Sequence, residues 1–169
     1  QWAEFIAASV VKRCDDEFLY RHPTESFAAH VKHAIDAMAS RPSGVIKVGC
    51  FKPRTSKQGY ELPMYVLETC MADQPFIVDT IKLVLRSMEI RVLGTMHMIL
   101  PITRDSDGLV TDISADAGVG GNESLTCHLL GVSSVRGRVA AIRKKVAGHL
   151  ERAAVVVRDF TAMRDACGR

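Results

Sequence analysis

The sequence predicts an α+β sandwich, an antiparallel sheet of four to five strands with helices on one face. Three observations predict it. Helical and strand-like segments follow one another in the order α-β-β-α-β-β-β-α. The segment 62–72 is nearly all apolar, as a central strand should be. A chain of 169 residues also buries enough surface to fold without disulfides or metal.

The first well-patterned helix is predicted over residues 24–40, after a weakly patterned helical stretch over residues 2–20. Its start lies at Pro23-Thr24-Glu25 and its end at Arg41-Pro42-Ser43-Gly44. One face of this helix carries apolar residues at helical spacing, namely Phe27, Val31, Ile35 and Met38. Strand 45–51 follows, and a polar loop from Lys52 to Gly59 separates it from the next strand.

Strand 62–72 stops at Asp73-Gln74-Pro75, and a helix is predicted over residues 75–89. Proline suits the first turn of a helix, because its missing N–H would have no partner there. The side chain of Asp73 or Gln74 can accept a hydrogen bond from the free N–H groups of that turn. The segment is therefore a strand, a tight turn and a helix start.

Three further strands and a long helix complete the prediction. Strand 91–103 turns through Arg104–Gly108, a hairpin by composition, into strand 109–114. A glycine-rich loop from Ala117 to Asn122 leads to strand 124–130, which we expect at an edge of the sheet. The last helix runs from about residue 135 to 163, with one apolar face made of Val139, Ile142, Val146, Leu150, Ala153, Val157 and Phe160.

The element order is that of a permuted ferredoxin-like sandwich. That fold runs β-α-β-β-α-β, and moving its last helix and strand to the front gives the order of residues 24–114. We expect residues 1–40 to form a helical segment packing on the sheet and residues 41–131 to form the α+β domain. Residues 132–169 are expected to form a C-terminal helix that leads to the remainder of a longer protein.

Composition excludes several classes of protein. The chain has 47% hydrophobic and 24% charged residues and a net charge of +3, and no apolar run approaches the ~20 residues of a membrane span. The N-terminus lacks the charged start of a signal peptide. The five cysteines form no CxxC pair, so we expect free thiols and a cytoplasmic protein. The absence of an initiator methionine suggests a fragment.

The segment Asp73-Gln74-Pro75-Phe76-Ile77-Val78-Asp79-Thr80 resembles a family pattern. ACT domains carry a strand that ends in D-x-P and opens a helix. A closer similarity is to the N-terminal ACT-like region of the large-subunit class of bacterial NAD-dependent glutamate dehydrogenase, with D-x-P-F-[LI]-V-D-[ST]. Two later elements also resemble that family: His97 before Arg104-Asp105-Ser106-Asp107-Gly108, and the strand Glu123–Leu129 with one extra residue before His128.

The resemblance implies a regulatory or assembly domain that is itself non-catalytic. The parent enzyme would oxidise L-glutamate to 2-oxoglutarate and ammonia with NAD. The domain's partners would be other domains of its chain and further subunits of a homo-oligomer. No cofactor is expected in this fragment, because the glycine cluster Gly118-Val119-Gly120-Gly121 lacks GxGxxG spacing. An alternative is a purely structural module with no small ligand.

The best candidate site is the turn itself, with Asp73, Gln74, Pro75, Phe76 and Asp79 as candidate binding residues. Backbone donors and the positive end of a helix converge there, which favours an amino-acid or dicarboxylate effector. Glycine near this turn lets the ligand approach the backbone in ACT domains. Phe76 stands there instead, and its ring either fills that space or plugs into the core. The alternative interpretation is a capped helix with an aromatic anchor.

Other candidates have simpler interpretations. His30 and His33 lie one helical turn apart, but no further ligand completes a metal set, so we expect a solvated helix face and no metal. His97 and His128 are expected to be hydrogen-bonded sheet histidines, with no catalytic partners. The basic run from Arg136 to Arg152 is expected to be a solvated or inter-domain face. No nucleic acid is expected, because strand 109–114 has no aromatic residue and strand 45–51 has only Phe51, at its end.

Overall fold

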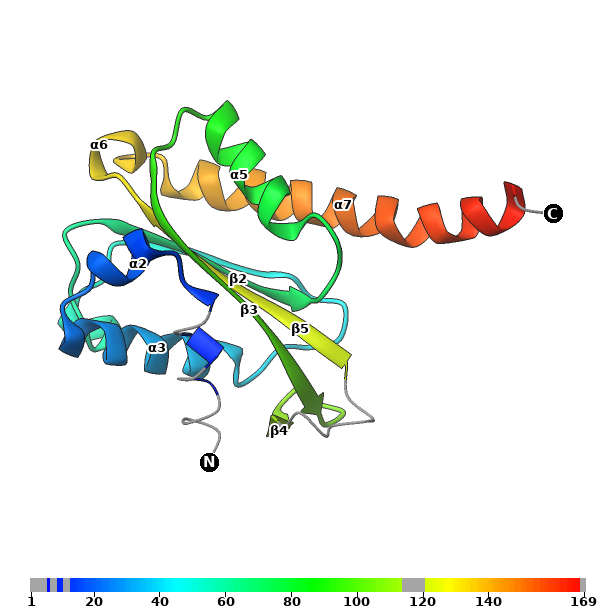
Figure 1. Cartoon of the computed structure of the whole chain (residues 1–169), viewed down its shortest axis with the longest axis horizontal. Helices are drawn as coiled ribbons and strands as arrows, with labels where there is room; N and C mark the ends of the chain where they lie inside the picture. The colour runs from blue at the N-terminus through cyan, green and yellow to red at the C-terminus, as the bar shows by residue number, and fades with distance from the viewer. Residues whose placement is uncertain (1–5, 7–8, 11–12, 114–120, 168–169) are drawn as a thin grey trace.

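The computed structural model describes residues 6, 9–10, 13–113 and 121–167 (Figure 1). One sheet holds β1 (Lys47–Phe51), β2 (Tyr65–Ala72), β3 (Val92–Arg104), β4 (Val110–Ile113) and β5 (Gly121–Leu130). Its spatial order is β1-β2-β5-β3-β4, and every neighbouring pair is antiparallel. The predicted α+β class with a five-stranded antiparallel sheet is confirmed.

Strand β5 lies in the middle of the sheet, so its predicted place at an edge is wrong. It pairs with β2 on one side and with β3 on the other, and residues 123–130 are all buried. The four-residue β4 pairs only with the end of β3 and becomes the edge strand. The physical reason is length, because a ten-residue strand can hydrogen-bond along two long neighbours and a four-residue strand cannot.

Helices cover both faces of the sheet, so the prediction of helices on one face is also wrong. Helices α5 (Ile77–Ser87) and α7 (Val139–Cys167) lie on one face, while α2 (Asp16–Tyr20) and α3 (Thr24–Met38) lie on the other (Figure 1). Strand β2 shows why, since successive side chains of a strand point to opposite faces. Val66 belongs to the core beneath α3, and Leu67 belongs to the core beneath α5 and α7.

Helix α7 extends well beyond the sheet (Figure 1). The apolar face predicted for it is confirmed as far as Leu150, which is fully buried. It is wrong for Phe160, whose side chain is 62% exposed. Two short helices, α4 (Thr55–Gln58) and α6 (Val132–Val135), connect the main elements. The part of α7 after Leu150 thus has little of this chain's core to pack against.

Two predictions fall wholly or partly outside the described residues. Of the helical stretch predicted over residues 2–20, residues 2–5, 7–8 and 11–12 lie outside, and residues 16–20 form α2. Of the glycine-rich loop, residues 117–120 lie outside, and Gly121 and Asn122 belong to β5.

The five cysteines are free, as predicted. Cys50, Cys70 and Cys127 are buried on strands. Over the described parts of the chain, no helix combines the length and the apolar character that a membrane crossing requires.

Candidate functional site

The turn between β2 and α5 differs in detail from the prediction. Helix α5 begins at Ile77, after a turn through Pro75 and Phe76, rather than at the proline. Among the described residues no side chain caps its N-terminus, so the predicted cap from Asp73 or Gln74 is wrong. The backbone N–H of Asp73 instead donates to the carbonyl oxygen of Asn122 at 2.8 Å. That bond ties the end of β2 to the start of β5, and the first turn of α5 keeps its free donors.

Phe76 adopts a left-handed backbone conformation with φ of 69°. This conformation costs a residue with a side chain about 1–2 kcal/mol, which is why such turns usually hold glycine. The ring does not enter the core, because the residue is 65% exposed. The carbonyl oxygen of Phe76 accepts the N–H of Thr80 at 2.9 Å. The helix therefore starts from a strained turn that stands open to solvent.

All five residues predicted for the site line one surface hollow of about 560 Å³. Strand β3 adds His97 and Ile99 to its wall. The sequence predicts His97 only as a hydrogen-bonded sheet histidine and not as part of this site, because its distance from the turn depends on the pairing of β3 with β5. The recurrence of a histidine before the R-D-x-D-G turn was the only signal that could have included it.

The electrostatics of this hollow are mixed. The N-terminus of α5 carries a partial positive charge, and Asp73 and Asp79 supply carboxylates. Burial lowers the pKa of His97, although the charge of Asp73 acts in the opposite direction. His97 is therefore a neutral hydrogen-bonding group at neutral pH. The amide nitrogen of Gln74 is buried and has no hydrogen-bond partner among the described residues.

A row of polar side chains lies on the sheet face that α5 and α7 cover. The hydroxyls of Thr69 and Thr126 are 2.7 Å apart, and Nε2 of His97 lies 2.8 Å from Oγ of Ser124. Nδ1 of His128 lies 3.3 Å from Oγ1 of Thr95. The interpretation of His97 and His128 as hydrogen-bonded sheet histidines is confirmed. Burial lowers the pKa of His128 to about 3, so its ring stays neutral.

His30 is buried, so the expectation of a solvated helix face is wrong for this residue, which is 1% exposed. It points from α3 onto the sheet, where Glu68 of β2 and Cys127 of β5 meet it. His33 is half-buried, and its Nε2 lies 3.6 Å from Oε2 of Glu68. A periodic helix pattern could not reveal these partners, because they come from strands that only the fold brings together.

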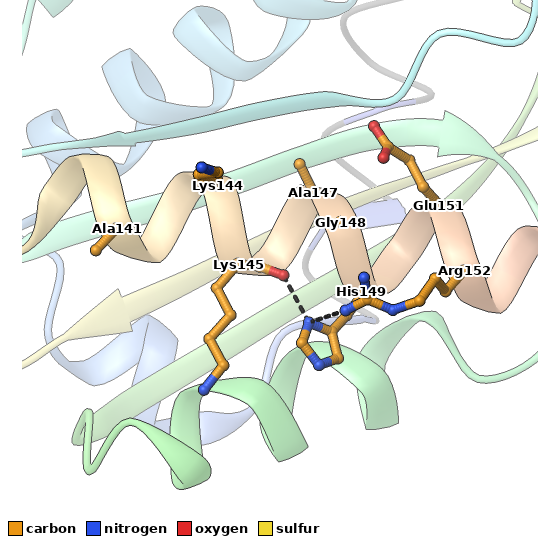
Figure 2. A pocket seen from close by; sticks show the side chains of 8 residues that line it. All are labelled: Ala141, Lys144, Lys145, Ala147, Gly148, His149, Glu151 and Arg152. Carbon is orange, nitrogen blue, oxygen red and sulfur yellow. Dashed lines mark hydrogen bonds between the residues drawn. The ribbon is translucent and has the colours of Figure 1, made fainter.

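A second hollow, of about 590 Å³, lies along α7 and is lined by that helix alone (Figure 2). Nδ1 of His149 lies 2.8 Å from the carbonyl oxygen of Lys145 and 3.0 Å from Nη2 of Arg152. Figure 2 shows the side chains of Lys145 and His149 on the side of α7 that faces α5. Because only α7 forms its walls, this hollow would contact a ligand from one side only. This basic flank of α7 is therefore a weaker candidate site than the turn before α5.

The antiparallel sheet, the strand that ends in Asp-Gln-Pro and the helix that follows define an ACT-like domain. The family model of the glutamate dehydrogenase ACT1 domain matches residues 5–150. The chain therefore belongs to the glutamate dehydrogenase ACT1 domain family, and its parent is a glutamate dehydrogenase. Comparisons with curated proteins and with solved structures find no match.

Proposed function

We propose that this chain is the effector-sensing region of an NAD-dependent glutamate dehydrogenase of the bacterial large-subunit class. The parent enzyme oxidises L-glutamate to 2-oxoglutarate and ammonia in the cytoplasm. Family membership supports the glutamate dehydrogenase part of this proposal. The finer assignment is supported by the three ordered sequence elements around Asp73, Arg104 and Glu123.

The effector in this proposal is an α-amino acid or a dicarboxylate bound at the turn before α5. The observation that carries it is the open hollow at an uncapped helix N-terminus, with Phe76 turned out to solvent. A carboxylate would accept hydrogen bonds from the free N–H groups of the first turn and from the Gln74 amide. An α-ammonium group would pair with the carboxylate of Asp73 or Asp79.

In this proposal, ligand binding changes the position of α5, and α7 transmits that change to neighbouring domains or subunits. The end of α5 is tied to α7, because Nζ of Lys145 donates to Oγ of Ser87 at 3.1 Å. Arg138, just before α7, donates to the carbonyl oxygen of Met88 at 2.9 Å. Since α7 leads away from the sheet, a ligand that favours one packing of α5 on α7 would bias neighbouring domains or subunits.

The dinucleotide is assigned to other parts of the parent enzyme. A dinucleotide-binding unit needs parallel strands joined through a helix that opens with a glycine-rich turn. Every strand pair of the described sheet is antiparallel. The described residues therefore form no such unit, and in this proposal NAD binding and catalysis belong to other parts of the parent enzyme.

A second candidate is a structural role in assembly without a small ligand. The exposed apolar side chains of Val155, Val156 and Phe160 on the projecting part of α7 favour it. Such side chains on a helix that leaves the sheet are suited to packing against another domain or subunit.

Thermal unfolding of the 169-residue chain with millimolar amino acids or dicarboxylates tests the proposal. A ligand at about 100 times its dissociation constant raises the unfolding midpoint by roughly 5–10 °C for a domain of this size. The shift should vanish in Asp73→Ala and persist in Asp36→Ala, which removes an exposed carboxylate from α3 on the other face of the sheet. No shift with any of these compounds would favour the assembly role.

A further inference from the structure

A compact set of buried polar side chains lies beneath α3, on the sheet face opposite the turn. His30 of α3, Glu68 of β2 and Cys127 of β5 each offer one ligand atom, and these atoms lie within 4.8 Å of one another. The three residues are 1%, 7% and 0% exposed, respectively. Three ligating groups from three separate elements are thus held together in the core, away from the proposed effector site.

The hydrogen bonds of His22 orient the ring of His30. Nδ1 of His22 lies 2.7 Å from the carbonyl oxygen of Phe18, which can only accept, so this nitrogen carries a proton. Burial lowers the pKa of His22 to about 4, which keeps the ring neutral at neutral pH. In a neutral imidazole that carries its proton on Nδ1, the other nitrogen is an acceptor, so Nε2 of His22 accepts. That atom lies 2.8 Å from Nδ1 of His30, which must then donate. With the proton on Nδ1, Nε2 is the nitrogen of His30 that can present a lone pair to a metal ion.

This lone pair faces a carboxylate. Nε2 of His30 lies 3.6 Å from Oε1 of Glu68, and neither atom has a hydrogen-bond partner among the described residues. Two acceptors that face each other in a buried site leave both groups unsatisfied, which is costly. A proton or a metal ion bound between Nε2 of His30 and Oε1 of Glu68 removes this energetic cost.

Tyr60 and His33 lie next to these buried ligating groups. The hydroxyl of Tyr60 is buried without a partner, and its ring stacks on that of His30 with centroids 4.9 Å apart. Burial raises the pKa of Tyr60, and the charges of Glu68 and Cys127 raise it further. Oε2 of Glu68 is held by His33 at 3.6 Å.

We propose that Nε2 of His30, the carboxylate of Glu68 and the sulfur of Cys127 bind one divalent transition-metal ion of the Zn²⁺ class. Imidazole, carboxylate and thiolate are the three ligand types that Zn²⁺ takes in proteins. On binding, the Cys127 thiol releases its proton to solvent and the sulfur forms a bond to the ion. A water takes the fourth position of the ion.

Two features favour a metal over a shared proton. The chain from the Phe18 carbonyl through His22 to Nδ1 of His30 is the outer support that metal-bound histidines usually have. Glu68 also lines a cavity of about 160 Å³ between α3 and the β1–β2 edge, with Ala37 and Lys47 on its wall. This cavity gives an ion a path from solvent to the carboxylate. The ion would join α3 to β2 and β5, so its role is structural.

Titration of the metal-free 169-residue chain with Co²⁺ tests this inference, because a cobalt–thiolate bond gives a charge-transfer absorption band. One equivalent of Co²⁺ should produce the band, and Zn²⁺ should abolish it by competition. Cys127→Ser should lose the band, and His30→Gln should weaken binding at least tenfold. Cys50→Ser is the matched control, since Cys50 is a buried strand cysteine on the opposite face, and it should keep the band.

Zn²⁺ should also raise the unfolding midpoint of the wild-type chain and of Cys50→Ser, but not that of Cys127→Ser. Circular dichroism of each metal-free variant establishes that it is folded before titration. The inference is overturned if the folded wild-type chain binds no Co²⁺ or Zn²⁺. It is equally overturned if Cys127→Ser keeps the band, since another cysteine, such as Cys14 or the exposed Cys167, would then be the ligand.

Discussion

The guanidinium of Arg104 donates two hydrogen bonds to the carboxylate of Glu123, from Nε at 2.7 Å and from Nη2 at 2.8 Å. Arg41 binds the same carboxylate through Nε at 3.0 Å and Nη2 at 2.7 Å. Arg104 also donates to the carbonyl oxygens of Met38 and Gly108. One buried carboxylate thus joins the end of α3, the β3–β4 hairpin and the central strand β5. Two of the sequence elements that resemble the glutamate dehydrogenase family meet in this cluster.

The first prediction concerns this cluster. Glu123→Gln keeps the side-chain shape but removes the charge that pairs with both Arg41 and Arg104. Breaking a buried ion pair by removing one partner typically costs about 3–5 kcal/mol. We expect a loss of that size in the free energy of unfolding, measured by urea denaturation. Glu151→Gln, at an exposed position of α7, is the control and should change stability little. A loss below about 1 kcal/mol in Glu123→Gln would contradict the structural role.

The second prediction is a pH dependence that belongs to Glu123. Burial alone would raise the pKa of this carboxyl, but the hydrogen bonds from Arg104 and Arg41 outweigh burial and lower it from 4.5 to about 2. Between these values the unfolded chain binds the proton and the folded chain does not, so stability falls as the pH falls. The contribution is complete above pH 4.5 and disappears toward pH 2.

Urea denaturation of the wild-type chain and of Glu123→Gln at several pH values checks this dependence. By linkage, the wild-type chain should lose about 2 kcal/mol more than Glu123→Gln between pH 5.5 and pH 3. Other carboxyl groups titrate in both proteins and cancel in the difference. Parallel stability profiles for the two proteins would show that Glu123 keeps an ordinary pKa.

The strand-turn-helix around Asp73 was predictable from the sequence because its signals are local. An apolar run ends at Asp-Gln-Pro, and the next apolar residues follow helical spacing. The left-handed Phe76 was not predictable, since a residue with a side chain rarely adopts that conformation. The surrounding structure imposes this strained conformation on Phe76 against the residue's own backbone preference.

The strand order was harder to predict because it depends on pairings between distant segments. Strand β5 lies between β2 and β3 through long-range ladders that no local pattern records. For the same reason, the sequence did not predict the buried group around His30, because its partners Glu68 and Cys127 come from two different strands. The sequence shows these residue types, but it does not show that the fold brings them into contact.

The third prediction concerns Gly94 of β3. A Cβ at this position would lie 2.8 Å from both Cα and N of Phe18, so α2 must move if the glycine is replaced. Overpacking of this kind typically costs about 1–3 kcal/mol. Gly94→Ala should therefore lower the free energy of unfolding by that amount. Gly121→Ala is the matched control, because a Cβ there meets nothing within 4 Å. Equal stability of the two variants would show that α2 does not dock tightly on β3.

The fourth prediction separates the backbone of Phe76 from its ring. Phe76→Gly removes left-handed strain of about 1–2 kcal/mol but adds the conformational entropy of glycine, about 0.5–1 kcal/mol. The net effect should be neutral or stabilising by about 1 kcal/mol, which thermal unfolding measures. Phe76→Ala removes the ring but keeps the strain, so it should be no more stable than the wild-type chain. A large loss in Phe76→Gly would mean that the exposed ring makes stabilising contacts.

The fifth prediction locates the point at which α7 stops contributing to the core. Leu150 is fully buried, whereas Phe160 lies on the projecting part of the helix and is 62% exposed. Leu150→Ala should cost about 2–5 kcal/mol, as for other buried leucines, while Phe160→Ala should stay within about 0.5 kcal/mol. Urea denaturation of both variants at two protein concentrations makes the comparison. If Phe160→Ala is strongly destabilising at high concentration only, its ring packs against a second copy of the chain, which would support the assembly role of α7.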